Sequence, residues 1–388
     1  MNTDSIKSIL TLRYDYTQTP FLPKLTWQNL EKKQNFSVDE LQNHIASNIT
    51  KQIPTSYSGP ISISLSGGID SSIVLCILKQ VFPDNQIDAI SIKFSDSVDE
   101  TETASKIAKK IGVDHHIVEI NNFLEKLENV ISITKLPFWD VHWIYVVEKA
   151  KQFSNYLVSG DGGDELFGGY VFRYAKFLSI INDKSDINDK IKAYISCHER
   201  DHVPEQEQIF GTKFQFQWED IYQKLKPYFD NSLHPLDQVF LADYNGKLLH
   251  NFSLVNKKIT NHFNLKSVTP LLSNELIHKS MKIPISQKYN SSLNIGKIPL
   301  RQLLTKFGID NLVEKQKLGF SVNTKNLWKN FGFSMVKKYF DNSTTVRDGW
   351  INQTWIDSNL TADGIDIRHV NKLLGLLAFE IWYRNIEL

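Results

Sequence analysis

Residues 66–72, with the sequence Ser-Gly-Gly-Ile-Asp-Ser-Ser, combine the residue types that bind phosphate groups. They follow a predicted buried strand and open a predicted helix. A helix amino terminus offers unpaired N–H groups and a positive dipole end, and glycines let the backbone approach phosphate oxygens. Asp70 would repel phosphate unless a cation lay between them, so we interpret it as a Mg²⁺ ligand. The alternative interpretation is a tight turn with Asp70 capping the helix.

A second segment, residues 157–170, interleaves glycines with three carboxylates, Asp161, Asp164 and Glu165. It also follows a predicted strand. Gathering three carboxylates costs repulsion unless cations or a cationic partner are present. A solvated acidic loop is the alternative, but apolar residues flank the segment on both sides. The segment therefore predicts a second wall of the same anion- and metal-binding site.

The elements around these segments alternate in a regular way. Short β-branched runs alternate with helical stretches from about residue 60 to 170, which indicates βαβ units and a parallel sheet. We predict strands at 61–65, 87–94, 115–120 and 156–158, and helices at 69–79 and 101–111. Ligands bind beyond the carboxyl ends of such strands, where both segments lie. The predicted fold class is α/β, with a parallel sheet and a mostly helical carboxyl-terminal part.

The chain has 388 residues, which at about 150 residues per domain suggests two or three domains. We divide it into an amino-terminal arm (1–55), an α/β core (56–170) and a helical portion (171–388). The first 35 or so residues show no clear periodicity and predict an irregular arm. Polar tracts at 182–190 and 341–349 predict solvated loops, and leucines at 373–377 predict a buried helix face.

The first segment resembles the pyrophosphate loop (PP-loop) of the N-type ATP pyrophosphatases, which have an adenine-nucleotide α-hydrolase-like fold. Both segments together resemble the synthetase domain of asparagine synthetases, from about residue 60 to 328. Supporting pieces follow in the family's order: an acidic stretch at 99–102, His115-His116, a Lys-x-x-Leu-Arg element at 297–301 and a Lys-x-x-Gly-Phe element at 315–320.

This resemblance implies a ligase that adenylates a carboxylate with ATP, releases pyrophosphate and transfers ammonia or an amine. It implies Mg²⁺ held by Asp70 and Asp164, and catalytic roles for Asp161, Glu165 and Lys297. Lys297 neutralises the departing phosphates from a loop, residues 290–296, that would close over ATP. The residues implied in binding ATP and pyrophosphate are Leu65, Ser66, Gly67, Gly68, Asp70, Ser71, Ser72, Ile92, Ser159 and Gly160.

Two departures from the family concern the acceptor, which is the carboxylate substrate. An Asp-Arg pair of the family is replaced here by Lys257-Lys258, and Asp161 stands where the family has glutamate. Both put aspartate as the substrate in doubt. Ammonia-dependent asparagine formation remains the leading activity. A lasso-cyclase-like ligase, or one for another metabolite or peptide, is the alternative, and so is a subunit that docks on a separate glutaminase chain.

Residue 2 is Asn2 and the two cysteines, Cys76 and Cys197, are internal, so we expect no glutaminase nucleophile and no glutaminase domain in this chain. Two cysteines suit buried thiols in a reducing compartment, and we expect a cytoplasmic protein. The formal net charge of +1 argues against nucleic acid and anionic membranes as partners. The expected partners are a small carboxylate and ammonia or an amine. A separate glutaminase subunit and a homodimer remain open.

Overall fold

The described residues form a five-stranded, wholly parallel sheet in the order β3-β2-β1-β4-β5. The computed structural model describes residues 2–95, 97, 99–313 and 322–387. Chain order reverses at β1, since β2 and β3 extend the sheet on one side and β4 and β5 on the other. The strands are β1 (Ile61–Ser64), β2 (Ile87–Phe94), β3 (Asp114–Ile120), β4 (Tyr156–Val158) and β5 (Lys266–Val268).

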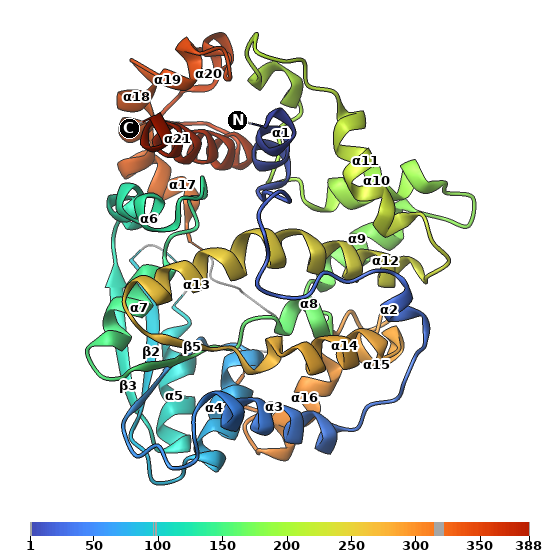
Figure 1. Cartoon of the computed structure of the whole chain (residues 1–388), viewed down its shortest axis with the longest axis vertical. Coiled ribbons are helices and arrows are strands. Elements are labelled where there is room, and N and C mark those ends of the chain that lie inside the picture. The colour runs from blue at the N-terminus through green and yellow to red at the C-terminus, as the bar shows by residue number, and fades with distance from the viewer. Residues whose placement is uncertain (1, 96, 98, 314–321, 388) are drawn as a thin grey trace.

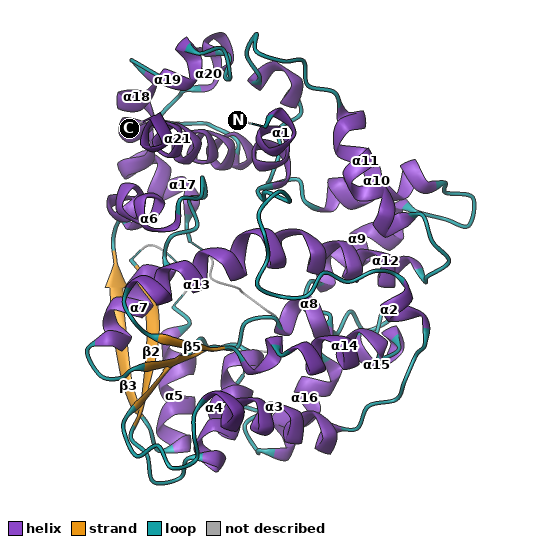
Figure 2. Ribbon diagram, in the orientation of Figure 1, coloured by secondary structure: helices purple, strands orange, loops and turns teal. Residues whose placement is uncertain are grey.

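Helices account for most of the remaining chain, as Figure 2 shows in purple. The helices up to the end of the second glycine-rich segment are α1 (Thr3–Leu12), α2 (Gln28–Glu31), α3 (Val38–Gln52), α4 (Ile69–Val81), α5 (Thr101–Ile111), α6 (Leu127–Thr134), α7 (Trp143–Lys151) and α8 (Gly163–Phe167). Those that follow are α9 (Val171–Ile180), α10 (Ile187–Cys197), α11 (Trp218–Phe229), α12 (Pro235–Asp243), η3 (Tyr244–Phe252), α13 (Ser253–His262), α14 (Asn274–Lys282), α15 (Ile285–Lys288), α16 (Ile298–Lys306), α17 (Thr324–Leu327), α18 (Phe333–Phe340), α19 (Thr344–Arg347), α20 (Gln353–Asn359) and α21 (Ile367–Glu387).

The predicted α/β class, with a parallel sheet and a mostly helical carboxyl-terminal part, is confirmed. The four predicted strands and both predicted helices form within one or two residues of their expected bounds. Strand β1 is buried on both faces, as expected of a central parallel strand covered by helices. The sequence analysis missed β5, because its three residues carry no alternating or β-branched pattern that distinguishes them from a loop.

The prediction of an irregular amino-terminal arm is wrong for its first part. Asn2 caps α1 by accepting a hydrogen bond from Asp4 N, and Ile6, Ile9 and Leu10 are buried. Helix α1 packs against α11 and α21, so the arm is anchored by its apolar face. Figure 1 shows α1 and α21 side by side although they lie at opposite ends of the chain.

The two polar tracts are also more ordered than predicted. In residues 182–190, Asp186 forms a capping box with Asp189 and starts α10. In residues 341–349, Ser343 caps α19 and Thr345 is buried. Ser343 and Thr345 both donate hydrogen bonds to the buried Glu380 carboxylate of α21. The first tract supplies a helix cap, and the second supplies a helix cap and a buried hydrogen-bond network.

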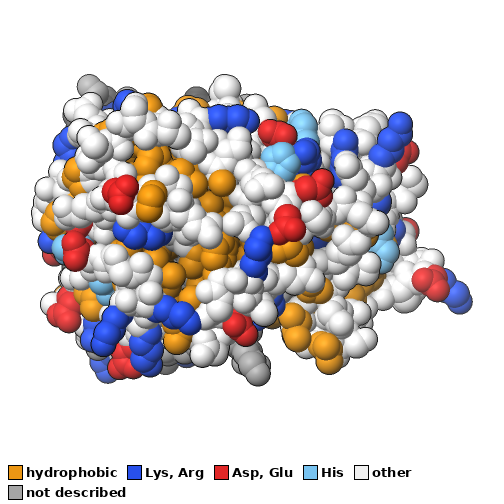
Figure 3. All heavy atoms as spheres, turned by 90° about the horizontal axis from the view of Figure 1, so that it is seen from below, with side chains coloured by type: hydrophobic (Ala, Val, Ile, Leu, Met, Phe, Trp, Pro, Cys, Tyr) orange, Lys and Arg blue, Asp and Glu red, His pale blue; other side chains and the backbone are white. Residues whose placement is uncertain are grey.

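The predicted leucine face at 373–377 is confirmed, since the leucines there are buried on α21. Cys76 and Cys197 are buried free thiols, and burial raises the pKa of Cys76 to about 12 and that of Cys197 to about 11. In the described ranges, no helix is long and apolar enough to cross a membrane. Figure 3 shows one end of the molecule, where hydrophobic side chains gather near the centre and charges of both signs surround them.

Candidate active site at the carboxyl edge of the sheet

The first glycine-rich loop connects β1 to α4 and folds back on the start of that helix. Ser66 N donates a hydrogen bond to Ser71 Oγ at 3.0 Å, and Gly68 N donates to Ser66 Oγ at 3.2 Å. The Ser66 and Ser71 hydroxyl oxygens lie 3.0 Å apart, and Ser72 Oγ donates to Gly68 O at 2.7 Å. The first-turn N–H groups of α4 therefore lie beside hydroxyl groups, an arrangement that suits a phosphate.

The second glycine-rich loop follows β4 and lies directly on the first. A Cβ atom built on Gly160 would lie 2.7 Å from Ser71 N, and one built on Gly163 would lie 2.2 Å from Asp70 Cγ. A side chain at Gly160 would therefore push the first loop away, and one at Gly163 would push the Asp70 carboxylate from its place. Strands β1 and β4 are neighbours at the point where chain order reverses, which is where open parallel sheets form their ligand crevice.

Lys297 comes to this edge from the helical part and joins the two loops. Its Nζ lies 2.5 Å from Asp70 Oδ2 and 2.8 Å from Asp164 Oδ1. Lys297 precedes α16 in the left-handed region, at φ +56°, and Pro299 occupies the first turn of that helix as predicted. A Cβ atom on Gly169 would lie 1.7 Å from Asp164 Oδ1, so the backbone cradles the ion pair.

Electrostatics hold this lysine in its charged form. Burial alone lowers the pKa of Lys297, but the Asp164 and Asp70 carboxylates raise it by more, so the pKa lies well above the ordinary value. The ammonium group is therefore charged at any physiological pH. The Lys297 ammonium group lies between two converging carboxylates, so it could exchange these partners for the oxygens of a phosphate group.

Asp161 lies in the same loop and is half-buried. Burial raises the pKa of Asp161, while the hydrogen bond from Asn256 and the nearby Ser159 side chain lower it by less. Asn256 Nδ2 donates to Asp161 Oδ2 at 3.2 Å from α13. A half-buried carboxylate with a raised pKa is suited to taking up a proton.

The other predicted residues fall around this core. Glu165 is buried on α8 and accepts a 2.6 Å hydrogen bond from the Tyr170 hydroxyl. Leu65 N donates to Ile90 O, and Ile92 lies two residues further along β2, beyond the end of β1. Gly67 packs against Thr103 of α5, and Ser159 N donates to Val268 O of β5. The structure thus brings all the predicted binding residues to one edge of the sheet.

The Lys257-Lys258 departure does not face this site. Lys258 Nζ donates a 2.6 Å hydrogen bond to Thr134 O, and Lys257 lies over the Phe21 ring at 4.0 Å. The preceding residue, Asn256, is the one that reaches Asp161. Sequence reasoning missed Asn256 because a single asparagine on a helix gives no signal of its own.

The histidine pair that the sequence analysis noted lies on β3. His115 contacts Ser91 and Ser105, while His116 contacts Asp88, so the two rings serve the packing of β3. The element at 315–320 lies outside the described residues. Within the described ranges, no three metal-ligating side chains of the His, Cys, Asp or Glu type cluster together. Mg²⁺ needs no such cluster when one or two carboxylates are completed by phosphate and water.

The fold and this edge define a parallel α/β protein with a helix amino terminus, hydroxyl groups and a lysine–carboxylate triad converging on one crevice. The family of asparagine synthases has a sequence profile that matches residues 52–384. The chain therefore belongs to the asparagine synthase family, which confirms the resemblance seen in the two glycine-rich segments.

Individual relatives agree with this assignment. The glutamine-hydrolyzing asparagine synthetase 1 of Bacillus subtilis is 23% identical over 401 residues, covering 94% of this chain and 62% of that protein. The glutamine-hydrolyzing asparagine synthetase of Gallus gallus is 32% identical over 127 residues, covering 29% of this chain and 22% of that protein. The chain thus spans less than two thirds of the length of these relatives. NMN synthetase from Francisella tularensis aligns at 14% identity over 54% of this chain and 95% of its own, with a TM-score of 0.29 that supports no conclusion.

Proposed function

We propose that this protein is an ATP-dependent amide-forming ligase. A carboxylate substrate attacks the α-phosphorus of ATP, and pyrophosphate leaves to give an acyl-adenylate. Ammonia or an amine then attacks the acyl carbon, so that the products are an amide, AMP and a proton. The observation that carries this proposal is the convergence of the Ser66 loop, Asp70, Asp164 and Lys297 at the carboxyl edge of the sheet.

The adenylation step brings one anion towards another, so charge neutralisation is the main task of the protein. The amino terminus of α4 and the Ser66 and Ser71 hydroxyl groups suit the pyrophosphate portion of ATP. Lys297 is already charged and already at this point, so it can exchange its carboxylate partners for phosphate oxygens. Residues 290–296 precede it and could close the site against water.

Mg²⁺ fits the same point, because Asp70 and Asp164 both direct a carboxylate oxygen at one position, the Lys297 ammonium group. These two side chains would hold the ion. When bound, Mg²⁺ neutralises phosphate charge and orients the leaving pyrophosphate.

Asp161 is placed to act in the second step. Its raised pKa makes the carboxylate a base of useful strength, and Asn256 fixes the orientation of one of its oxygens. We assign to Asp161 the removal of a proton from the attacking amine, and to Glu165 on the adjoining helix α8, which accepts a hydrogen bond from Tyr170, a supporting catalytic role.

Aspartate and ammonia are the leading substrates within this proposal, which would make asparagine the product. A peptide or another metabolite as acceptor is the alternative, and a separate glutaminase chain is an alternative source of ammonia. These choices affect the acceptor and the amine, and leave the adenylation chemistry unchanged.

The test is ATP–pyrophosphate exchange, measured with aspartate and a panel of other carboxylates, followed by amide formation with ammonium. We expect exchange that depends on one class of carboxylate, and its loss in Asp70→Asn. Absence of exchange with every carboxylate, with and without a co-purified amidotransferase, would overturn the proposal. Substantial exchange in Asp70→Asn would remove the assignment of Asp70 to Mg²⁺.

A further inference from the structure

The hydrogen-bond ladder between β1 and β2 stops one step before the crevice. Leu65 N donates to Ile90 O at 2.8 Å, so the next bond of this parallel pair would run from Ile92 N to Leu65 O. Among the described residues that bond does not form, and the pairing of the two strands ends at Ser64 opposite Ile90. The Leu65 carbonyl and the Ile92 N–H therefore lie at the edge of the crevice without bonding to each other.

The Ser91 side chain takes the place of the missing donor. Ser91 Oγ donates to Leu65 O at 2.6 Å, and only 3% of the residue is exposed. Ile90 bonds to Leu65 through its backbone, so the backbone of Ile92, two residues further along β2, faces the same side. The Ile92 N–H is therefore directed at the crevice beyond the end of β1.

The same bond holds the first peptide group of the phosphate loop, which joins Leu65 to Ser66. The carbonyl of this peptide accepts from Ser91 Oγ, and its N–H donates to Ser71 Oγ at 3.0 Å. Both polar groups of the peptide are thus occupied, so it cannot rotate without breaking a hydrogen bond. A serine of β2 thereby fixes the point at which the chain leaves β1 and enters the loop.

His115 of β3 sets the direction in which the Ser91 hydroxyl donates. Its Nε2 lies 2.7 Å from Ser91 Oγ, and its Nδ1 lies 2.9 Å from Ser105 Oγ of α5. Ser91 gives its one proton to Leu65 O, so its oxygen must accept from His115 Nε2. The imidazole therefore carries its proton on Nε2, and Nδ1 accepts from Ser105. Burial and the neighbouring His116 lower the pKa of His115, which keeps the ring in this neutral form at physiological pH.

We propose that Ser91, oriented by His115, is a positioning residue for nucleotide binding. By occupying the Leu65 carbonyl, its hydroxyl keeps the Ile92 N–H available as a donor to the nucleoside part of ATP. Without the hydroxyl, this N–H would close on the Leu65 carbonyl and extend the ladder by one bond, because both backbone groups need a partner. The donor would then be lost from the crevice. The inference rests on the proposed function for the identity of the ligand as ATP.

Calorimetric titration of Ser91→Ala with AMP and with pyrophosphate, each in the presence of Mg²⁺, tests the proposal without catalysis. AMP should bind about three- to tenfold more weakly than to the wild type, because one hydrogen-bond donor is withdrawn. Pyrophosphate should bind as before, since the Ile92 N–H then holds the Leu65 carbonyl and the loop stays in place. Equal weakening of both ligands would show that the whole loop has shifted and would overturn the proposal, as would unchanged binding of AMP.

Two substitutions of His115 test its part in orienting the serine. A glutamine amide nitrogen reaches the place of imidazole Nε2, whereas an asparagine amide nitrogen reaches only the place of Nδ1. His115→Gln can therefore still donate to Ser91 and should keep the wild-type affinity for AMP. His115→Asn should weaken AMP by about twofold or more and leave pyrophosphate unchanged. The same ratio of AMP to pyrophosphate affinity in both variants would overturn the role of His115, and misfolding cannot mimic the expected difference between them.

Ser91→Thr and Ser95→Ala are the matched controls. Ser91→Thr keeps the hydroxyl group and should bind AMP within about twofold of the wild type. Ser95 Oγ donates to Ile120 O at 3.2 Å, which is a similar bond to a carbonyl at the end of β3, away from β1. Ser95→Ala should leave both affinities unchanged. A loss of AMP affinity in Ser95→Ala equal to that in Ser91→Ala would overturn the proposal, because any loosening of the sheet would then produce the effect.

ATP–pyrophosphate exchange separates this inference from the proposed function. In Ser91→Ala the KM for ATP should rise about three- to tenfold with little change in kcat, because the reacting groups stay in place. An unchanged KM for ATP, with normal exchange, would overturn the positioning role and leave the ligase standing. Absence of exchange in the wild type, with the expected difference in AMP affinity intact, would count against the ligase and support the positioning role alone.

Discussion

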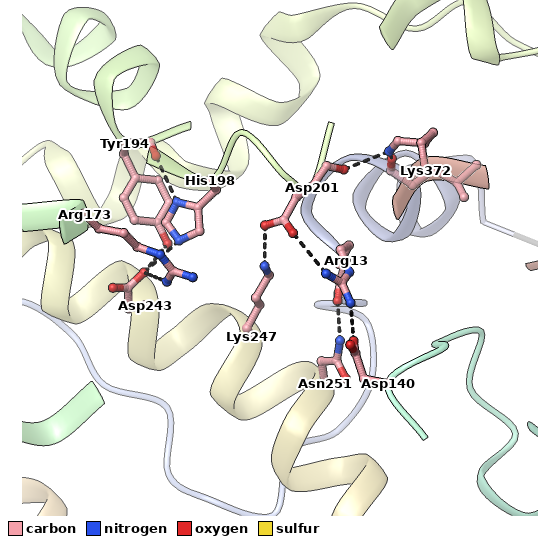
Figure 4. Close-up of polar contacts among 11 residues, drawn as sticks. Arg13, Asp140, Arg173, Tyr194, His198, Asp201, Asp243, Lys247, Asn251 and Lys372 are labelled. Carbon is pink, nitrogen blue, oxygen red and sulfur yellow. Dashed lines mark hydrogen bonds and ion pairs between the residues drawn. The ribbon is translucent and has the colours of Figure 1, made fainter. Parts of the chain in front are cut away.

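The two buried ionic clusters of this protein are built in different ways. At the sheet edge, Lys297 sits between Asp70 and Asp164, and glycine backbone forms the walls. In the helical part, Arg173 lies on α9, Asp243 on α12 and Asp201 in the loop after α10, and other side chains surround them (Figure 4). The first cluster is positioned by backbone that tolerates no side chain, whereas the second is positioned by side-chain packing. Substitutions should therefore affect chemistry most at the sheet edge.

The largest loss is expected from Lys297→Met. It removes the cation that faces both carboxylates and leaves them to repel each other and the incoming phosphates. ATP–pyrophosphate exchange should fall roughly 10³-fold, as for other removals of a charge that stabilises phosphoryl transfer. Lys306→Met is the matched control on the same helix, because Lys306 is exposed and pairs with Asp39. Comparable losses in both variants would show that the effect is not electrostatic.

Gly163→Ala tests whether the close approach of this glycine to Asp70 matters for the chemistry. The added Cβ would lie 2.2 Å from Asp70 Cγ, so the Asp70 carboxylate must shift from its place beside Lys297. A displacement of about 1 Å in such a site can cost roughly 10²-fold in rate, and we expect a loss of that order for Gly163→Ala. Gly375→Ala in α21 meets no atom within 4 Å and should leave exchange unchanged. Normal exchange in Gly163→Ala would show that the position of the Asp70 carboxylate is not critical.

Asn256→Ala sharpens the role assigned to Asp161. The Asn256 hydrogen bond favours the ionised carboxylate, so its removal raises the pKa of Asp161 further. The acidic limb of the pH profile for amide formation should then move upward by about one to two pH units, since a hydrogen bond to a charged group is worth about 1.5–3 kcal/mol. Asn261→Ala, at an exposed position of α13, is the control. An unchanged acidic limb of the pH profile would show that Asp161 is not the base.

The smallest effect on activity is expected at Lys288, a buried charge in neither cluster. Its Nζ has no hydrogen-bond partner among the described residues and lies 4.8 Å above the Phe240 ring. Burial lowers the pKa of Lys288 from 10.5 to about 7. Below pH 7 the full cost of burying the charge is present, and the free energy of unfolding rises between pH 7 and 10.5 because the unfolded chain binds the extra proton there.

Lys288→Met should therefore raise the free energy of unfolding at pH 7 by more than about 1 kcal/mol and flatten that rise. Denaturant unfolding across this pH range is the measurement, with Lys306→Met expected to change stability by less than about 0.5 kcal/mol. A destabilised Lys288→Met would show that the ammonium group has a favourable partner.

The same contrast explains what could be predicted from the sequence. The sheet-edge site was visible because close backbone contacts demand glycine and because its acids lie within two short segments that follow strands. Asn256, Arg173 and Asp243 gave no signal, since isolated polar residues on helices look like solvent-facing ones until the helices are packed. Helix α1 was missed for a related reason: Ile6, Ile9 and Leu10 make up a single buried stripe that short polar neighbours obscure.

The central claim is that a carboxylate oxygen attacks the α-phosphorus of ATP at the sheet edge. It is tested most directly with a substrate whose carboxylate carries ¹⁸O, followed by mass spectrometry of the nucleotide products after amide formation. The account predicts one ¹⁸O atom in AMP, because the oxygen that bridges acyl carbon and phosphorus leaves with AMP. The label in inorganic phosphate together with ADP, or AMP without label, would contradict it.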